Sequence, residues 1–574
     1  MTADIPTSAT KKKFGYTHLL RELHCDDEAV DDQLSTIFMR CSLLSELVKG
    51  LACTACHSST LAVRAVDCAL GVVCMLETHC TSCGEIVNKT YSSDRLGGVK
   101  SSSAPFVVVR SLVSATMDMG VGHSGLVKLC RHMDMPAMHH STFNTHMKEV
   151  TSANMRLVTS VLDEAAQVVR KAHKELDPSI DENGIIDITV SYDGTWMTRG
   201  FKSLYGAGCV VDVITGLVLD FSVKSLYCQT CTSAKARLGA DTPEFDTWFE
   251  RHFNECNINY TGNPGGMEVA VAEDLWDRSV DRHGFRYTTI LSDGDAKTFK
   301  RLSEMEVYGP DVTIEKEECV NHVAKRMKTA LLKLAAEGKK RGVVLGGQGH
   351  GKLTGTTIKK LAGYYDNAIR SNRGNLEGMR EAVFASFFHT ISTDEDPHHT
   401  HCPEGATSWC FYQKALAKGE EPGSHHENVH TALSREVASH VKDVYLRLGH
   451  RDLLNRCLRV ETQNKNESIH SKIWTKCPKT GFVGLMRVVT AVCASVAEFN
   501  EGIGMTVERT FALMAIPSGQ QRKKSARKAD QLRLKKAERQ VKDSSKQARH
   551  ARKMAARATT RATTASSSYS AGAF

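Results

Sequence analysis

Apolar and polar residues alternate in the middle of this chain, and a period of two is typical of β-strands. The alternation occupies Ile185–Val190 and residues 207–221, where the turn Thr215-Gly216 separates two strands. Tyr287–Leu291 has the length and composition of a further short strand. We therefore expect a sheet to be built from these segments.

Helical spacing of apolar residues dominates on both sides of the strands. It extends through residues 14–50 and 105–175 before them, and through 296–390 and 428–460 after them. With 574 residues the chain is long enough for several domains. A sheet flanked by this much helix predicts the α/β fold class.

Charge is concentrated at the C-terminal end. The formal net charge is +9, but residues 522–561 alone hold 16 Lys and Arg against 3 Asp and Glu, which leaves 58 basic and 62 acidic residues elsewhere. Such a tail predicts salt-dependent binding to nucleic-acid phosphates, and Lys523-Lys524 and Lys535-Lys536 suit import into the nucleus. Its composition predicts at best a solvated helix.

Membrane and secreted classes are not expected. No apolar run reaches the ~18–20 residues of a membrane span, and the first 13 residues are polar. The 19 cysteines would then lie in a reducing compartment, where cysteine pairs indicate metal ligands sooner than disulfides.

The first metal-ligand pattern consists of two Cys-x-x-Cys pairs with 23 residues between them, Cys53, Cys56, Cys80 and Cys83. Four thiolates in two such turns suit tetrahedral Zn²⁺ and predict a zinc ribbon. His57, Cys74 and His79 are additional candidate ligands, and a scatter of buried free cysteines is the alternative. The site would be structural, would contact DNA, or both.

A second pattern predicts a closed, structural Zn²⁺ site with Cys-x-x-Cys and His-x3-Cys spacing, formed by Cys228, Cys231, His252 and Cys256. Reduced cysteines beside an exposed histidine are the alternative. A third segment is also rich in such residues: His398, His399, His401, Cys402, Cys410, His425 and His426. There an exposed His-rich loop is favoured over a metal site.

Acidic residues stand at the ends of two strands and before a later helix. Asp193 closes the first strand, Asp293 closes the strand that contains Tyr287–Leu291, and Glu467 precedes a helix. Three such carboxylates can hold two Mg²⁺ ions roughly 3.5–4 Å apart. Turn formation by each Asp-Gly pair is the alternative. Asp295 is a competing candidate for the second acidic position, but the strand-end position of Asp293 favours Asp293.

Residues 119–149 are compatible with a helix-turn-helix that reads DNA. Met135-Pro136 breaks two helical segments, and the polar residues available for contact are Arg131, His140, His146 and Lys148. A plain helical hairpin is an equally good interpretation.

Four segments together resemble a known family. They are Asp193–Trp196, Ser292–Asp295, Cys319–His322 and Thr462–Lys479, of which the last is the most specific. They resemble the domain of Mutator-like transposases, which belong to the DDE transposases and have an RNase H-like core. The resemblance extends from about Cys53 to about Lys479.

The resemblance implies roles for individual residues. Asp193, Asp293 and Glu467 match the catalytic Asp, Asp and Glu, and would hold Mg²⁺ or Mn²⁺. Cys319 and His322 match a Cys-x-x-His signature, for which we favour a structural function. His470 departs from the family pattern, where we expect Asn.

The implied activity is cleavage of double-stranded DNA at element ends and transfer of the freed strand to target DNA, by a homo-oligomer in the nucleus. A domesticated, non-catalytic, zinc-dependent DNA-binding protein is the main alternative. An RNase H-like nuclease acting on RNA is the third.

The expected organisation follows from the motifs and the resemblance. It comprises an N-terminal helical segment (1–50), a zinc ribbon-like segment (51–104), a helical segment (105–178), an RNase H-like core with a mixed sheet (179–500) and a basic, largely disordered tail (517–574). The core would contain a zinc-binding insertion (222–275) and a large helical insertion (296–460).

Overall fold

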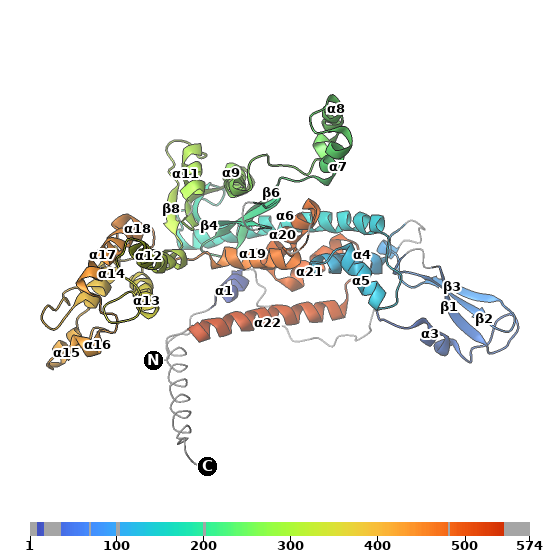
Figure 1. The fold of residues 1–574 in the computed structure, drawn as a ribbon. Coiled ribbons are helices and arrows are strands. Elements are labelled where there is room, and N and C mark those ends of the chain that lie inside the picture. The colour runs from blue at the N-terminus through green and yellow to red at the C-terminus, as the bar shows by residue number, and fades with distance from the viewer. Residues whose placement is uncertain are drawn as a thin grey trace, which may run out of the picture.

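The computed structural model describes most of the chain. The described residues are 8–16, 36–67, 71–98, 104–198, 202–294, 296–479, 481 and 483–544. They form two sheets and many helices, so the α/β class is confirmed at the level of a mixed fold (Figure 1). No helix within these ranges combines the length and the apolar composition that crossing a bilayer requires.

The N-terminal part contains a small antiparallel sheet of β1 (Leu61–Asp67), β2 (Met75–Cys80) and β3 (Ile86–Tyr91). Two short helices, α1 (Ala9–Tyr16) and α3 (Cys41–Val48), precede it, and the 3₁₀ turn η1 (Leu96–Gly98) follows. The helix predicted over 14–50 is therefore wrong for residues 36–40, which are not helical, while residues 17–35 lie outside the described residues.

The helical segment before the strands is confirmed. It consists of α4 (Val107–Asp118), α5 (His123–His132) and α6 (His140–Leu176), and these helices form a core with the loop near Val73 and with Met514 and Ile516 from the C-terminal part. The length of α6 lets one helix reach from this core to the central sheet, where Ala165 and Val169 are buried.

The central sheet has five strands in the order β6-β5-β4-β7-β8. These strands are β4 (Ile186–Trp196), β5 (Tyr205–Asp212), β6 (Val218–Ser225), β7 (Phe285–Ser292) and β8 (Glu315–Glu318). β4, β5 and β6 pair antiparallel, whereas β7 and β8 run parallel to β4. The predicted strands are thus confirmed, with β8 as an unpredicted addition.

Helices cover both faces of this sheet. On one face lie α9 (Met267–Asp277), α10 (Ser279–His283) and α11 (Ala296–Met305), and the core there includes Trp276 and Tyr192. On the other face lie α19 (Asn464–Lys476) and α20 (Leu485–Glu501), with Cys209 and Val211 in the core. The long helix α6 contributes to both cores. Successive strand residues therefore point to opposite helical layers, as the pleat requires.

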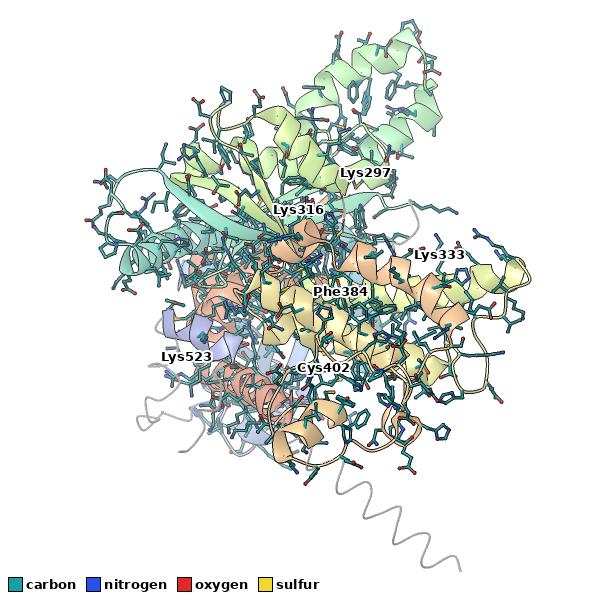
Figure 2. All side chains as sticks on the ribbon, turned by 90° about the vertical axis from the view of Figure 1, so that its left-hand side faces the viewer. Lys297, Lys316, Lys333, Phe384, Cys402 and Lys523 are labelled. Carbon is teal, nitrogen blue, oxygen red and sulfur yellow. The ribbon has the colours of Figure 1, made fainter. Side chains whose placement is uncertain are left out.

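Two helical segments are inserted between elements of the central sheet and its covering helices. The first carries α7 (Gln229–Leu238), α8 (Pro243–His252), η2 (Phe253–Glu255) and η3 (Pro264–Gly266). The second, between β8 and α19, is a helical insertion of α12 (Val320–Lys340), α13 (Gly355–Ser371), α14 (Leu376–Ile391), α15 (Phe411–Lys418), α16 (His425–Asn428), α17 (Arg435–Leu448) and α18 (Arg451–Asn455). It has its own apolar core and faces the viewer in Figure 2, where Phe384 and Cys402 mark it.

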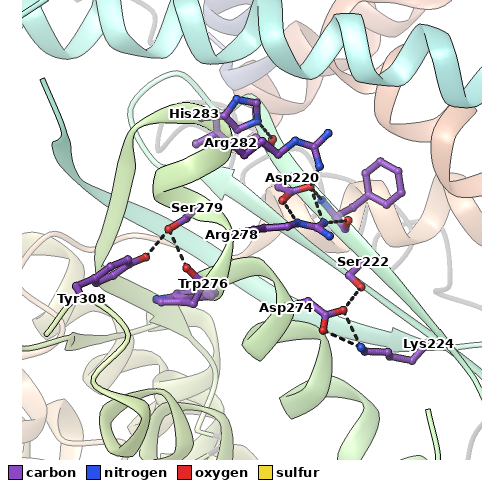
Figure 3. Close-up of polar contacts among 12 residues, drawn as sticks. Asp220, Ser222, Lys224, Asp274, Trp276, Arg278, Ser279, Arg282, His283 and Tyr308 are labelled. Carbon is purple, nitrogen blue, oxygen red and sulfur yellow. Dashed lines mark hydrogen bonds and ion pairs between the residues drawn. The ribbon is translucent and has the colours of Figure 1, made fainter. Parts of the chain in front are cut away.

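Charged contacts fasten α9 and α10 to the sheet (Figure 3). The buried carboxylate of Asp220 on β6 accepts hydrogen bonds from Arg278 at 2.7 and 2.9 Å and from Arg282 at 2.9 Å. Lys224 of the same strand donates to Asp274 at 2.8 Å. These bonds fix the helical layer on that face relative to the edge of the sheet.

The C-terminal part consists of α21 (Ile503–Leu513) and α22 (Gln520–Ser544), and α22 packs against both α21 and α1. Ala526 and Asp530 of α22 are buried, so the prediction of a solvated helix is wrong for this part of the basic tail. Residues 545–574 lie outside the described residues.

Candidate active site and metal centres

The register of the parallel strands brings Asp193 and Asp293 to neighbouring positions. Ser191 of β4 pairs with Leu291 of β7, and each aspartate follows its paired residue by two positions. Residues two apart along a strand point to the same face. The two carboxylates therefore lie side by side, where the pairing of β4 with β7 ends.

The sequence predicts that the first strand ends at Asp193, but β4 continues beyond this residue. It continues to Trp196, because its antiparallel pairing with β5 persists through Asp193↔Cys209 to Trp196↔Gly206. Only the parallel pairing with β7 ends earlier. Asp193 is therefore held in regular strand geometry and shares its face with Cys209, in the layer formed by α19 and α20. Asp295 lies outside the described residues.

Helix α19 is hydrogen-bonded directly to β4. The side chain of Asn466, fully buried, accepts from Ser191 Oγ at 2.6 Å and donates to the carbonyl of Cys209 at 3.0 Å. Gln463, one residue before the helix, donates to the carbonyl of Tyr192 at 2.7 Å. These amides fix the first turn of α19, which carries Glu467, on the face where Asp193 lies.

The electrostatics of Asp193 indicate that the three predicted carboxylates are near one another. Burial, followed by the charges of Asp293 and Glu467, raises the pKa of Asp193 to about 7. Like charges that hinder ionisation are a common feature of catalytic carboxylates and of metal sites.

His470, one turn after Glu467, lies beside Asp193. Its Nδ1 is 3.6 Å from Asp193 Oδ2, and burial lowers the pKa of the imidazole to about 4. The ring is therefore neutral at physiological pH. It fills space next to the carboxylate without adding a positive charge.

Cys319 and His322 lie at the end of the third parallel strand. Ser292 pairs with Glu318, so Cys319 follows β8 next to Asp293, and its amide donates to the carbonyl of Ser292 at 3.1 Å. The buried Sγ of Cys319 accepts from the amide of Gln463 at 3.4 Å. Within the described ranges neither residue belongs to a cluster of metal-ligating side chains. Cys319 therefore supports the residue before α19, whereas His322 lies in the first turn of α12.

The first predicted zinc ligands converge. The Sγ atoms of Cys53 and Cys83 are 3.7 Å apart, those of Cys56 and Cys80 are 3.6 Å apart, and all four lie within 4.8 Å of one another. The residue after each Cys-x-x-Cys pair has a positive φ, 59° at His57 and 80° at Gly84. His57 therefore closes a turn and is not among the converging ligands; nor are Cys74 and His79.

The second predicted set also converges, at the junction of α7 and α8. Cys228 Sγ is 3.3 Å from His252 Nε2, and Cys231 Sγ is 3.4 Å from Cys256 Sγ. Trp248, one helical turn before His252, stacks on its ring with centroids 4.7 Å apart. The four ligand atoms form a compact group that could hold Zn²⁺.

The predicted helical pair over 119–149 is present as α5 and the start of α6. Arg131, His140 and Lys148 are exposed, whereas His146 is 7% exposed and faces the interior. His146 must therefore be removed from the predicted DNA contacts.

Comparison with known proteins places the chain in a family. The model of the Mutator-like transposase family matches residues 37–410. The chain belongs to this family. Membership supports a transposase function in the broad sense, with DNA as the partner. The match covers Asp193 and Asp293 and ends before Glu467. No curated protein and no solved structure matches the chain.

Three contributors to the site were not assigned a role from sequence. Asn466 and Gln463 lie inside the most specific motif, but their contacts with β4 require the fold. On the opposite face, the Glu268 side chain approaches Gly194 so closely that an added Cβ would come within 2.7 Å of it. The glycine of the Asp193-Gly-Thr-Trp motif is thereby explained by close packing.

Proposed function

We propose that this Mutator-like transposase cleaves DNA ends and transfers strands in an Mg²⁺-dependent reaction at Asp193, Asp293 and Glu467, on an RNase H-like core. The strand order supports the proposal, because three antiparallel strands are followed by two strands parallel to β4. Asp193 lies within β4, Asp293 directly follows β7, and Glu467 lies on α19. The observation that carries it is the register of β4 and β7, in which Asp193 and Asp293 each follow a paired residue by two positions, together with the hydrogen bonds from Asn466 and Gln463 that hold the start of α19 against β4. The raised pKa of Asp193, caused by burial and then by Asp293 and Glu467, agrees with this geometry.

The donor set fits a hard divalent cation. Carboxylate oxygens are the ligands that Mg²⁺ and Mn²⁺ prefer. Asp193, Asp293 and Glu467 would hold the ions. When bound, they would supply charge stabilisation for the attacking and leaving oxygens of the phosphodiester.

The residues around the three carboxylates would hold them in place. Asn466 and Gln463 hold Glu467 against β4, and the neutral ring of His470 beside Asp193 avoids competition with a cation. The proposed reaction begins with hydrolysis at an element end, which frees a 3′-hydroxyl. That hydroxyl then attacks a phosphodiester of target DNA, and a new P–O bond forms as the target bond breaks.

The zinc clusters have a different role in this proposal. Each has four protein ligands and no open position, so Zn²⁺ there would stabilise the fold and would not act in catalysis. The basic tail would add affinity for DNA and direct the chain to the nucleus, and the active assembly would be a homo-oligomer. In this proposal both the helical insertion and the zinc insertion interrupt the RNase H-like core.

The test compares Asp193→Asn and Glu467→Gln with wild type in nicking of plasmid and labelled duplex DNA, with Mg²⁺ or Mn²⁺. Nicking should fall about 100-fold or more in both variants, because each loses a metal-binding charge. Asp187→Asn is the matched control, since Asp187 lies on the same strand but is exposed and pairs with Arg286. Full activity in both variants would contradict the assignment.

The same assay separates the alternatives. A wild-type chain that binds DNA and never nicks it would favour a non-catalytic DNA-binding protein. Preferential hydrolysis of RNA strands would favour a nuclease that acts on RNA.

A further inference from the structure

A third cluster of metal-ligating side chains lies in the helical insertion, at the end where α15 and α16 are found (Figure 1). It contains His389 from the last turn of α14 and three residues from the loop that follows, His399, Cys402 and Cys410. All four are at most 9% exposed. Cys402 is labelled in Figure 2.

The spacing of the four ligand atoms matches a tetrahedron around zinc. Cys402 Sγ is 3.8 Å from Nδ1 of His389 and 3.8 Å from Nδ1 of His399, and Cys410 Sγ is 3.4 Å from Nδ1 of His399. Tetrahedral Zn–S and Zn–N bonds place neighbouring ligand atoms roughly 3.3–3.8 Å apart. All four atoms lie within 4.8 Å of one another.

A chain of hydrogen bonds determines which nitrogen of His399 is available. Asp394 Oδ1 lies 2.6 Å from His425 Nδ1, and a carboxylate only accepts, so His425 Nδ1 carries the proton. In the neutral ring His425 Nε2 is then an acceptor, and at 2.8 Å it accepts a hydrogen bond from the N–H of His399 Nε2. Consequently His399 Nδ1 has a free lone pair, which points at the two sulfurs.

This arrangement is typical of a metal-bound histidine. Such a histidine usually donates its other N–H to a partner that fixes the tautomer and the ring orientation. Tyr412 stacks on the ring of His399 with centroids 4.4 Å apart, and Gln413 donates to its backbone carbonyl at 2.9 Å. The ring is thus held by the hydrogen bond to His425 and by the stacking of Tyr412, while Gln413 holds the backbone of the same residue.

The loop that carries three of these ligands is long and has no regular structure to hold it in place. Residues 392–410 contain no helix or strand, although they lie within a compact helical insertion. Loops of more than about 12–15 residues without secondary structure are uncommon in compact domains. A four-ligand site would tie the middle of this loop, through His399 and Cys402, to His389 of α14 and to Cys410 at the start of α15.

We propose that His389, His399, Cys402 and Cys410 form a closed, structural Zn²⁺ site, with His425 and Asp394 as its outer support. Sequence spacing singled out this region but left its ligands open. His389 lies outside the His-rich loop, whereas His398, His401 and His426 are not members of the cluster.

The first test measures zinc per chain in full-length protein purified without chelators. The double variant Cys402→Ser/Cys410→Ser should contain one zinc ion fewer than wild type. Cys457→Ser is the control, because Cys457 is an equally buried cysteine of the same insertion, and it belongs to none of the groups of metal-ligating side chains found among the described residues. It should leave the zinc content unchanged. Equal zinc content in wild type and the double variant overturns the proposal.

A second measurement on wild type does not depend on the variant folding. Alkylation of each cysteine is followed by peptide mass spectrometry, with and without a chelator. Cys402 and Cys410 should become reactive at least tenfold faster after chelation, whereas Cys457 should not change. Identical rates for Cys402 and Cys410 in both conditions overturn the proposal.

The variant His425→Ala tests the outer support. It should retain the zinc ion but release it to a competing chelator 10- to 100-fold more readily, as loss of an outer-shell partner does. His426→Ala is its control, since His426 is exposed and outside the cluster. Unchanged release from His425→Ala contradicts its assigned role.

Discussion

Asp193 combines burial with two acidic neighbours, and this combination is unfavourable for its charged form. The pKa of Asp193 rises from 3.8 to about 7, first because of burial and then because of Asp293 and Glu467. A group whose folded-state pKa is raised above the unfolded value favours folding while it is protonated, and this contribution is lost as pH rises through the folded pKa. Without metal, stability therefore falls between about pH 4 and pH 7.

Asp193→Asn should remove this dependence on pH. Without added Mg²⁺ or Mn²⁺, the variant should be more stable than wild type at pH 8, by at most about 4 kcal/mol, and the two should be equally stable at pH 4. Urea unfolding at both pH values is the measurement, with Asp187→Asn as the control. A variant less stable than wild type at pH 8 would contradict the electrostatic interpretation.

Asn466 is the residue on which the position of Glu467 depends. Asn466→Ala should destabilise the chain by about 2–3 kcal/mol, because it leaves buried polar groups of Ser191 and Cys209 without their partner. Nicking should fall as Glu467 loses its support. Asn464→Ala is the matched control, because Asn464 is exposed on the same helix and should cost less than about 0.5 kcal/mol. Equal stability of both variants would argue against this role.

The candidate site is only partly predictable from sequence at this scale. The carboxylates Asp193 and Asp293 are recognisable because the motif places each beside a strand end. The amide contacts of Gln463 with β4 and of Asn466 with β5 span more than 250 residues, so no local pattern encodes them. His389 was missed for a similar reason, since it belongs to a helix and meets its partners only through the fold.

At the scale of elements, the strands β4 to β7 follow from alternation, but β8 does not. Its four residues, Glu315–Glu318, are all charged, and they lie where helical spacing is predicted. Charged side chains are common on edge strands, which they protect from further pairing. The position of β8 at the edge of the sheet explains why a pattern of apolar residues does not reveal it.

The composition of the tail does not predict that α22 packs against the body, because a charged residue makes an important part of this contact. The fully buried carboxylate of Asp530 accepts hydrogen bonds from the amides of Ile503 at 3.0 Å and Gly504 at 2.8 Å. These amides are at the N-terminus of α21, where backbone N–H groups lack partners within the helix. A basic segment thereby becomes part of the fold.

Asp530→Ala should loosen α22 from the body. The loss of two charge-assisted hydrogen bonds at a helix N-terminus should cost about 2–3 kcal/mol and should increase cleavage by protease between α21 and α22. Glu538→Ala is the control, since the pair of Glu538 with Lys11 is exposed and should contribute little. Protease sensitivity that rises equally in both variants would contradict the capping role.

At the scale of the whole molecule, charge and architecture separate the basic tail into two parts. Residues 520–544 belong to α22, which is joined to α21 and α1. Residues 545–574 hold six Lys and Arg and no acidic residue. Deleting the whole tail would therefore damage the fold, and a change in DNA binding would have two explanations.

Deletion of residues 545–574 alone should isolate the electrostatic contribution. Each phosphate contact contributes about 0.9 to the slope of log affinity against log salt concentration, so six lost cations should reduce the slope by as much as about 5. Affinity for duplex DNA is measured between 50 and 200 mM salt in both proteins. Replacing the six cations by Gln at full length is the control, and it should reproduce the deletion if charge is the cause. An unchanged slope in both variants would place the DNA contacts on the folded body, where the acidic excess requires a local basic surface.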